Sequence, residues 1–170
     1  KDMIASIRKA LLDEDSVWRE FTQSIFDQVD PCLIRKAVEC FFVNAGLEGE
    51  ASLQESAEKY DCNIPWAILL DPTSACNLSC TGCWAAQYGE RNNLSYKTLD
   101  SIVRQGKELG THFYIFSGGE PLVRKPDILK LCAEHQDCYF FAFTNGTLVD
   151  DAFCEELLRV GNFALAFSIE

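Results

Sequence analysis

The sequence predicts an α/β fold in which a parallel sheet follows an amino-terminal helical segment. After residue 64, short apolar runs alternate with amphipathic helical patterns, which is typical of parallel strands joined by right-handed crossovers. The ends of the second, third and fourth predicted strands, near residues 117, 144 and 170, are 27 and 26 positions apart. This regular spacing indicates a repeated strand–helix unit. We therefore place a domain boundary between residues 1–63 and residues 64–170.

The first 61 residues have a helical pattern and hold no catalytic constellation. Ser16 is placed to cap one helix, and Asp30-Pro31 supplies the cap and first turn of a second. Asn44–Gly46 is a plausible end for that second helix. Ser52–Glu55 has the form of a capping box that opens a short helix ending near Tyr60. We interpret the segment as a helical layer packed on the main domain, with substrate or partner recognition as the alternative.

Four apolar runs are predicted to be the strands of the sheet. They cover residues 66–70, 112–116, 139–143 and 163–167. Two of the intervening helices have clear signals, with Ser95 and Asp150 as N-caps and Gly110 and Gly161 as the residues that end them. Because ligands gather at the carboxyl ends of parallel strands, we expect functional residues along that edge.

Three cysteines follow the first predicted strand within eight residues. Cys76, Cys80 and Cys83 have the spacing C-x3-C-x2-C, and three thiolates on one loop can converge on one metal centre. A structural zinc ion favours four Cys or His ligands, and the two histidines of the chain, His112 and His135, lie far along the sequence. Three ligands suit a four-iron, four-sulfur cluster with one open iron. A zinc site, or a cluster that serves electron transfer alone, is the alternative.

Together with Ser117-Gly118-Gly119-Glu120-Pro121, the cysteine loop resembles the radical S-adenosylmethionine superfamily. The downstream segment is similar to the family's Gly-Gly-Glu motif in its GGEP form. The resemblance runs from about Ile64 to the last residue and does not cover the helical segment. It implies a partial (β/α) barrel, of which the chain holds the first four strand–helix units, and we expect this core to be truncated on its carboxyl side.

The resemblance implies that the three cysteines bind three irons of the cluster, while the amino and carboxylate groups of S-adenosylmethionine chelate the fourth. The other candidate cofactor-binding residues lie near the ends of the predicted strands: Gly118, Gly119, Glu120, Asn145, Ser168, Glu170 and Trp84. The two glycines allow the backbone to approach a ligand closely. Backbone carbonyls or the Glu120 side chain are then available to the ammonium group.

Some of these candidates have alternative interpretations. Ser168 and Glu170 lie two positions apart, so both side chains point to one face of a strand. The pair resembles the family's ribose-binding motif, yet it is also an ordinary strand pattern. Asn145 suits the methionine carboxylate or the ribose, but Asn-Gly is also a common turn. Many family members carry an adenine-contacting aromatic residue just before the third cysteine; here that residue is Gly82, and Trp84 follows the cysteine instead.

The resemblance implies an enzyme that reductively cleaves S-adenosylmethionine to methionine and a 5′-deoxyadenosyl radical, which abstracts hydrogen from an unidentified substrate. The implied partners are a small-molecule or peptide substrate and a flavodoxin- or ferredoxin-type electron donor. The net charge of −11 argues against nucleic acid as a partner. No apolar run approaches the ~20 residues that span a bilayer, so no membrane span is expected.

The cysteine content favours a reducing compartment. Nine is an odd count that includes one tight triplet, which fits a metal site better than a disulfide framework. Without a signal-peptide pattern, we expect a cytoplasmic protein. Cysteines within apolar helical patterns are expected to be buried and to act as small hydrophobes: Cys32, Cys40, Cys132 and Cys154. Cys62 and Cys138 lie near the ends of predicted elements.

Overall fold

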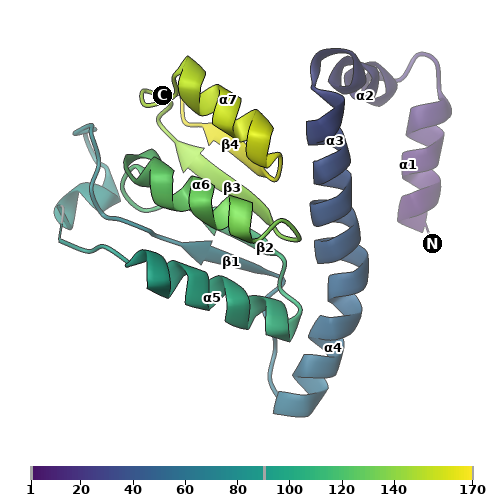
Figure 1. Ribbon diagram of the computed structural model, residues 1–170. Helices are drawn as coiled ribbons and strands as arrows, with labels where there is room; N and C mark the ends of the chain where they lie inside the picture. The colour runs from purple at the N-terminus through teal and green to yellow at the C-terminus, as the bar shows by residue number, and fades with distance from the viewer. Residues whose placement is uncertain (1, 90, 170) are drawn as a thin grey trace. The chain divides into compact units, whose positions relative to one another are not determined.

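The computed structural model describes residues 2–89 and 91–169. The chain divides into two compact units, residues 1–35 and residues 36–170. The first unit is helical and contains α1 (Asp2–Leu12), α2 (Val17–Gln28) and the start of α3 (Pro31–Ala37). The second unit holds the sheet and its helices (Figure 1). The boundary predicted between residues 63 and 64 marks the start of the expected radical SAM core rather than a division between compact units, and it stays a prediction.

The predicted caps of the first unit lie at the predicted helix ends. Ser16 is the N-cap residue of α2 and has extended backbone geometry. A side-chain oxygen of Asp30 accepts a hydrogen bond of 2.7 Å from the backbone N–H of Cys32, so this carboxylate satisfies a free donor in the first turn of α3.

The predicted helix end at Asn44–Gly46 and the predicted new start at Ser52 are both wrong. From α3 the chain continues through a π-helix, η1 (Val38–Glu48), directly into α4 (Gly49–Tyr60). Two long-range contacts hold the region that was expected to break. The side chain of Asn44 donates to the carbonyl of Asp137 (2.9 Å), and Trp66 Nε1 donates to the carbonyl of Ala45 (2.8 Å).

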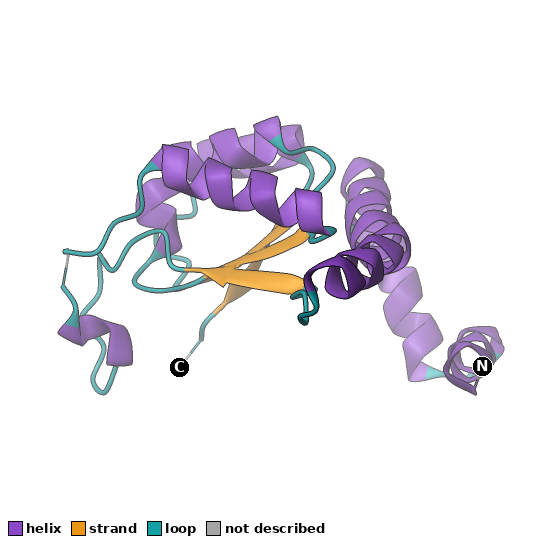
Figure 2. Ribbon diagram, turned by 90° about the horizontal axis from the view of Figure 1, so that it is seen from below, coloured by secondary structure: helices purple, strands orange, loops and turns teal. Residues whose placement is uncertain are grey.

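The second unit contains one parallel sheet with the strand order β1-β2-β3-β4. The strands are β1 (Ala67–Leu70), β2 (Phe113–Phe116), β3 (Tyr139–Thr144) and β4 (Phe163–Phe167). The longer connecting helices are α5 (Tyr96–Leu109), α6 (Lys125–Glu134) and α7 (Asp151–Val160), and the 3-10 turns are η2 (Trp84–Gln87) and η3 (Pro121–Arg124). Figure 2 shows α5, α6 and α7 on the same face of the sheet. Four adjacent parallel strands with these helices on one face form a partial (β/α) barrel.

The predicted helix signals are confirmed in the second unit. The Ser95 side chain accepts a hydrogen bond from Thr98 N–H, and Asp150 accepts one from Phe153 N–H. Gly110 and Gly161 end their helices in the left-handed region, at φ 100° and 76°. A residue with a Cβ adopts that conformation at a cost, which explains glycine at both ends.

The two faces of the sheet have different environments. Alternate strand residues such as Tyr114, Phe116 and Phe140 point toward the helices and are fully buried. On the opposite face, Leu69 and Phe143 remain about half exposed. The helix-covered face therefore holds the core, while the other face is apolar and open.

An aromatic cluster covers the amino-terminal end of the open face. The ring of Phe41, from η1, lies 5.0 Å from that of Phe113, 5.7 Å from Trp66 and 5.8 Å from Tyr139. All three contacts are edge-to-face arrangements, which aromatic rings favour. The amino-terminal end of the open face is therefore covered, while Leu69 and Phe143 stay exposed nearer the carboxyl ends of the strands.

The cysteines outside the triplet divide between buried and exposed positions. Cys40 and Cys132 are buried as expected, and Cys138 is buried as well. The expectation was wrong for Cys32 and Cys154, which are exposed, because they lie on helix faces that point away from the packed interior. In the described part of the chain, no helix is long and apolar enough to cross a bilayer.

Candidate functional site

The loops that follow the four strands surround one cavity of about 510 Å³. Nine of the ten predicted site residues line it: Cys76, Cys80, Cys83, Trp84, Gly118, Gly119, Glu120, Asn145 and Ser168. The tenth, Glu170, lies outside the described residues. A cavity of this size is within the ~300–1,000 Å³ range of small-molecule pockets. Parallel strand ends have thus brought together residues that are up to 92 positions apart (168 − 76).

The three predicted metal ligands are free thiols on the exposed loop between β1 and η2. The loop is locally ordered by two contacts, from Leu78 N–H to Cys76 Sγ (3.5 Å) and from Cys83 N–H to the Cys80 carbonyl (3.3 Å). Within the described residues, the three Sγ atoms do not all lie within 4.8 Å of one another.

The Gly-Gly turn packs directly on the backbone that leads into the cysteine loop. Gly119 N–H donates to the carbonyl of Thr73 (3.0 Å), and Glu120 N–H donates to that of Ala75 (2.8 Å). A Cβ on Gly119 would overlap the Ala75 carbonyl and approach the Ser74 carbonyl to 2.6 Å. From the sequence, we expected this glycine to allow the close approach of a ligand. In the structure, the approach of the neighbouring loop already requires it.

The Glu120 carboxylate is buried and accepts three hydrogen bonds from the protein. Its Oε1 accepts from Leu122 N–H (2.9 Å) and from the Thr144 hydroxyl (2.7 Å), and its Oε2 accepts from Asn145 N–H (2.8 Å). The side chain is only 1% exposed. This carboxylate therefore ties the loop after β2 to the end of β3. The Glu120 backbone is bonded as well, since its N–H donates to the Ala75 carbonyl and its own carbonyl accepts from Val123 N–H (3.1 Å).

The side chain of Asn145 is also held by protein groups. Its Nδ2 donates to Asn77 Oδ1 (2.9 Å), and its Oδ1 accepts from the backbone N–H (2.9 Å) and the hydroxyl (2.6 Å) of Thr147. Sequence reasoning did not single out Asn77, Thr144 or Thr147. Polar residues in loops are common, and only the fold brings these three to the same edge of the sheet.

Trp84 and Ser168 line the cavity from the segments that follow β1 and β4. Trp84 opens η2, is 60% exposed and forms an edge-to-face pair with Tyr88 at 6.3 Å. It also borders a smaller cavity of about 210 Å³ together with Asp71 and Gly118. Ser168 lies one residue beyond the end of β4, and its N–H extends the strand pairing by donating to the carbonyl of Thr144 (2.8 Å). The predicted same-face pairing of Ser168 with residue 170 stays a prediction.

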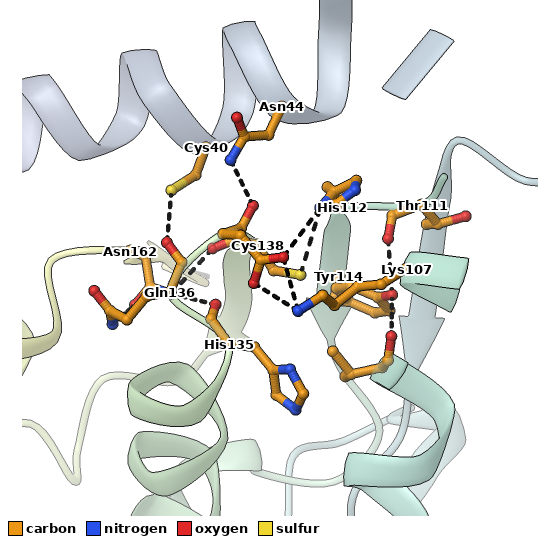
Figure 3. A network of polar contacts seen from close by, with 12 residues as sticks. Cys40, Asn44, Lys107, Thr111, His112, Tyr114, His135, Gln136, Cys138 and Asn162 are labelled. Atoms are coloured by element: carbon orange, nitrogen blue, oxygen red, sulfur yellow. Dashed lines mark hydrogen bonds and ion pairs between the residues drawn. The ribbon is translucent and has the colours of Figure 1, made fainter. Parts of the chain in front are cut away.

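A second group of metal-ligating side chains lies at the opposite, amino-terminal edge of the sheet (Figure 3). Ligand atoms of His112, Asp137 and Cys138 lie within 4.8 Å of one another. However, Lys107 Nζ is 2.7 Å from both carboxylate oxygens of Asp137, so the ammonium already neutralises this charge. Burial raises the pKa of the Cys138 thiol well above its ordinary value. We interpret the group as an ion-pair network that joins the starts of β2 and β3.

The fold and the cavity describe a partial (β/α) barrel that carries a three-cysteine loop at a cavity of small-molecule size. Residues 70–170, more than half of the chain, match the radical SAM superfamily. The chain therefore belongs to the radical SAM superfamily, a family of enzymes whose cofactors are a four-iron, four-sulfur cluster and S-adenosylmethionine. The three free thiols at the cavity rim fit the cluster as a donor set, and the cavity volume fits the small molecule.

The chain is similar to enzymes with diverse reactions. It is 36% identical over 101 residues to PqqA peptide cyclase of Granulibacter bethesdensis, covering 57% of this chain and 27% of that protein. It is 37% identical over 94 residues to a probable GTP 3′,8-cyclase of Archaeoglobus fulgidus, covering 52% of this chain and 30% of that protein. It is 31% identical over 107 residues to Fe-coproporphyrin III synthase of Methanosarcina barkeri, covering 61% of this chain and 27% of that protein. The chain thus spans less than a third of the length of these relatives.

The fold is similar to that of a solved radical SAM structure. The crystal structure of Streptococcus suis SuiB bound to S-adenosylmethionine superposes with a TM-score of 0.58 at 20% identity, covering 95% of this chain and 39% of that one. SuiB bound to its precursor peptide SuiA superposes with a TM-score of 0.57. At this level of identity the likeness concerns the fold, and it agrees with a partial barrel.

Proposed function

We propose that this chain carries the cofactor-binding part of a radical SAM enzyme that acts on a small-molecule or peptide substrate. The observation that carries the proposal is the single cavity that the cysteine loop shares with Gly118, Gly119 and Ser168. Held by these residues, the cluster and S-adenosylmethionine would together supply reductive cleavage of the sulfonium and hydrogen abstraction from the substrate.

Each part of the cavity wall has a distinct role in this proposal. Cys76, Cys80 and Cys83 hold the cluster, and their exposure at the cavity rim supports this assignment. The backbone carbonyls of the Gly-Gly turn take the ammonium group, because the Glu120 carboxylate is occupied by three protein donors. A hydroxyl at Ser168 suits the ribose, and the exposed ring of Trp84 offers an apolar surface to the adenine.

The apolar lining of the open face supports the exclusion of water around a reactive intermediate. Phe143 lines the cavity, and Leu69 lies further along the same open face. The aromatic cluster around Phe41 closes the far end of that face. This apolar surface beside the cavity helps to exclude water from a reactive intermediate.

We further propose that the chain belongs to the GGEP subtype, is supplied with electrons by a flavodoxin- or ferredoxin-type donor, and resides in the cytoplasm. The subtype is supported by Pro121, which follows Glu120 and opens η3. The location is supported by nine cysteines that are all free thiols. A peptide substrate is supported by the similarity to a peptide cyclase, and a small-molecule substrate by the similarity to a GTP cyclase.

Product analysis tests the proposal. The chain is reconstituted anaerobically with iron and sulfide, reduced, and incubated with S-adenosylmethionine, after which methionine and 5′-deoxyadenosine are quantified. We expect the wild type to form methionine and 5′-deoxyadenosine in a one-to-one ratio. Cys132→Ala, whose thiol is buried in α6, should form the same amounts as the wild type. Cys80→Ala should form neither. Failure of the reconstituted wild type to cleave S-adenosylmethionine would favour the alternative, a metal-binding module with a structural or electron-transfer role.

A further inference from the structure

Asn77 lies inside the cysteine loop but makes its side-chain contacts with a different loop. It follows Cys76, and its Nδ2 donates to the hydroxyl oxygen of Thr147 at 2.7 Å. Its Oδ1 accepts from Asn145 Nδ2 at 2.9 Å. Both partners belong to the loop between β3 and α7, about 70 residues along the chain. One side chain therefore connects the loop that carries the thiols to the loop at the end of the third strand.

The contact closes a ring of hydrogen bonds. Thr147 donates its hydroxyl to Asn145 Oδ1 at 2.6 Å, so Asn77, Asn145 and Thr147 each bond to the other two. The backbone N–H of Asn145 in turn donates to Glu120. Because Glu120 N–H donates to the carbonyl of Ala75, the path returns to the start of the cysteine loop. Three loops that share the cavity are thus linked through one continuous network.

Neither Asn77 nor Thr147 lines the cavity, in contrast to the cysteines and Asn145. The Asn145 amide contacts Asn77 through its Nδ2 and Thr147 through its Oδ1. The ring therefore has a geometry suited to holding the loops in place, and not to contacting a ligand from the side chains of Asn77 and Thr147.

We propose that Asn77, through Asn145 and Thr147, is a positioning residue that fixes the cysteine loop relative to the rest of the cofactor cavity. We call these three residues the loop latch. The latch keeps the thiols and the Gly-Gly turn at a constant separation, so that the metal-bearing loop and the small-molecule cavity form one preorganised site. The functional half of this inference rests on the proposed function, while the mechanical half concerns the chain alone.

Hydrogen exchange of the metal-free chain tests the mechanical half. The variants are Asn77→Ala, Thr147→Val, which removes the hydroxyl with little change in shape, and Thr147→Ser, which keeps it. Ser79→Ala is a control for a hydroxyl lost within the cysteine loop itself. We expect amides of residues 76–83 to exchange about threefold to tenfold faster in Asn77→Ala and Thr147→Val, the effect of losing one net hydrogen bond. Thr147→Ser, Ser79→Ala and the amides of α5 should match the wild type.

The affinity of the reconstituted protein for S-adenosylmethionine tests the functional half. We expect the dissociation constant to rise about threefold to tenfold in Asn77→Ala and Thr147→Val, with iron content unchanged. The double variant should be no weaker than the worse single one, because the two residues act through one ring. Unchanged exchange in residues 76–83 of both variants would overturn the latch. Faster exchange with unaltered affinity would overturn its positioning role. If the wild type itself does not bind S-adenosylmethionine while exchange responds as expected, the latch stands and the proposed function fails.

Discussion

Replacing Glu120 by glutamine distinguishes a supporting role for this carboxylate from direct contact with a ligand. The two oxygens of Glu120 accept hydrogen bonds from Leu122, Thr144 and Asn145, and all three donors point at the carboxylate. In Glu120→Gln, one oxygen becomes an NH2 group, which has no lone pair to offer. Whichever orientation the amide takes, at least one donor loses its acceptor and faces another donor.

The magnitude follows from the burial of the site. With Glu120 1% exposed, water cannot easily replace the missing acceptor. Hydrogen bonds to a charged group contribute about 1.5–3 kcal/mol, and a buried donor left unpaired costs about 1–3 kcal/mol. We therefore expect Glu120→Gln to lower the free energy of unfolding by about 2–3 kcal/mol. For a chain of this size, the melting temperature should fall by roughly 5–10 °C.

Urea denaturation of the metal-free chain, followed by circular dichroism, measures this loss. Glu156→Gln is the control, since Glu156 is a partly exposed residue that pairs with Arg159 on α7, and we expect it to unfold like the wild type. If Glu120→Gln also unfolds like the wild type but weakens binding of S-adenosylmethionine, the carboxylate contacts the ligand and the supporting role is refuted.

Three further predictions concern the frame of the site. Phe41→Ala removes the ring that contacts Trp66, Phe113 and Tyr139 and should lower the free energy of unfolding by about 3 kcal/mol, measured by urea denaturation; a loss below 1 kcal/mol would mean that the cluster is not formed. Gly119→Ala should disturb the cysteine loop and reduce both reconstituted iron and cofactor binding, because its Cβ overlaps the Ala75 carbonyl, whereas Gly46→Ala, with a nearest contact of 3.5 Å, should keep both. Burial raises the pKa of Asp137, but the hydrogen bond and charge of Lys107 outweigh it and hold that pKa below its ordinary value. A lowered folded-state pKa stabilises the fold above the ordinary value of about 4 and loses this contribution as the pH falls. The urea midpoint should therefore drop between pH 7 and pH 3, and it should drop less in Lys107→Ala.

Local sequence signals predicted the elements of the second unit closely. Each of the four strands begins and ends within one residue of the predicted run, because a short apolar segment between polar turns has few other conformations available. Ser95 and Asp150 were recognised as caps because a capping side chain bonds to a residue three positions away. The position of the site at the carboxyl edge followed from the parallel topology alone.

Features that depend on distant partners were not predictable. The helix was expected to end at Asn44–Gly46 because these residue types commonly end helices. Asn44 contacts Asp137, which lies 93 positions further along the chain, and Ala45 contacts Trp66, which lies 21 positions further. No local sequence pattern reveals partners at these separations. In the same way, the sequence suggested Glu120 and Asn145 as ligands of a cofactor. Only the folded chain brings Thr144 and Asn77 within hydrogen-bonding distance of them.

The most direct test of the account is electron paramagnetic resonance of the reduced, reconstituted chain with and without S-adenosylmethionine. Three cysteine ligands would leave one iron of a four-iron cluster free to bind S-adenosylmethionine. We therefore expect a reduced four-iron cluster whose signal shifts when S-adenosylmethionine is added, and no cluster in Cys76→Ala, Cys80→Ala or Cys83→Ala. A cluster signal that S-adenosylmethionine leaves unchanged, or colourless protein that retains zinc, would contradict it.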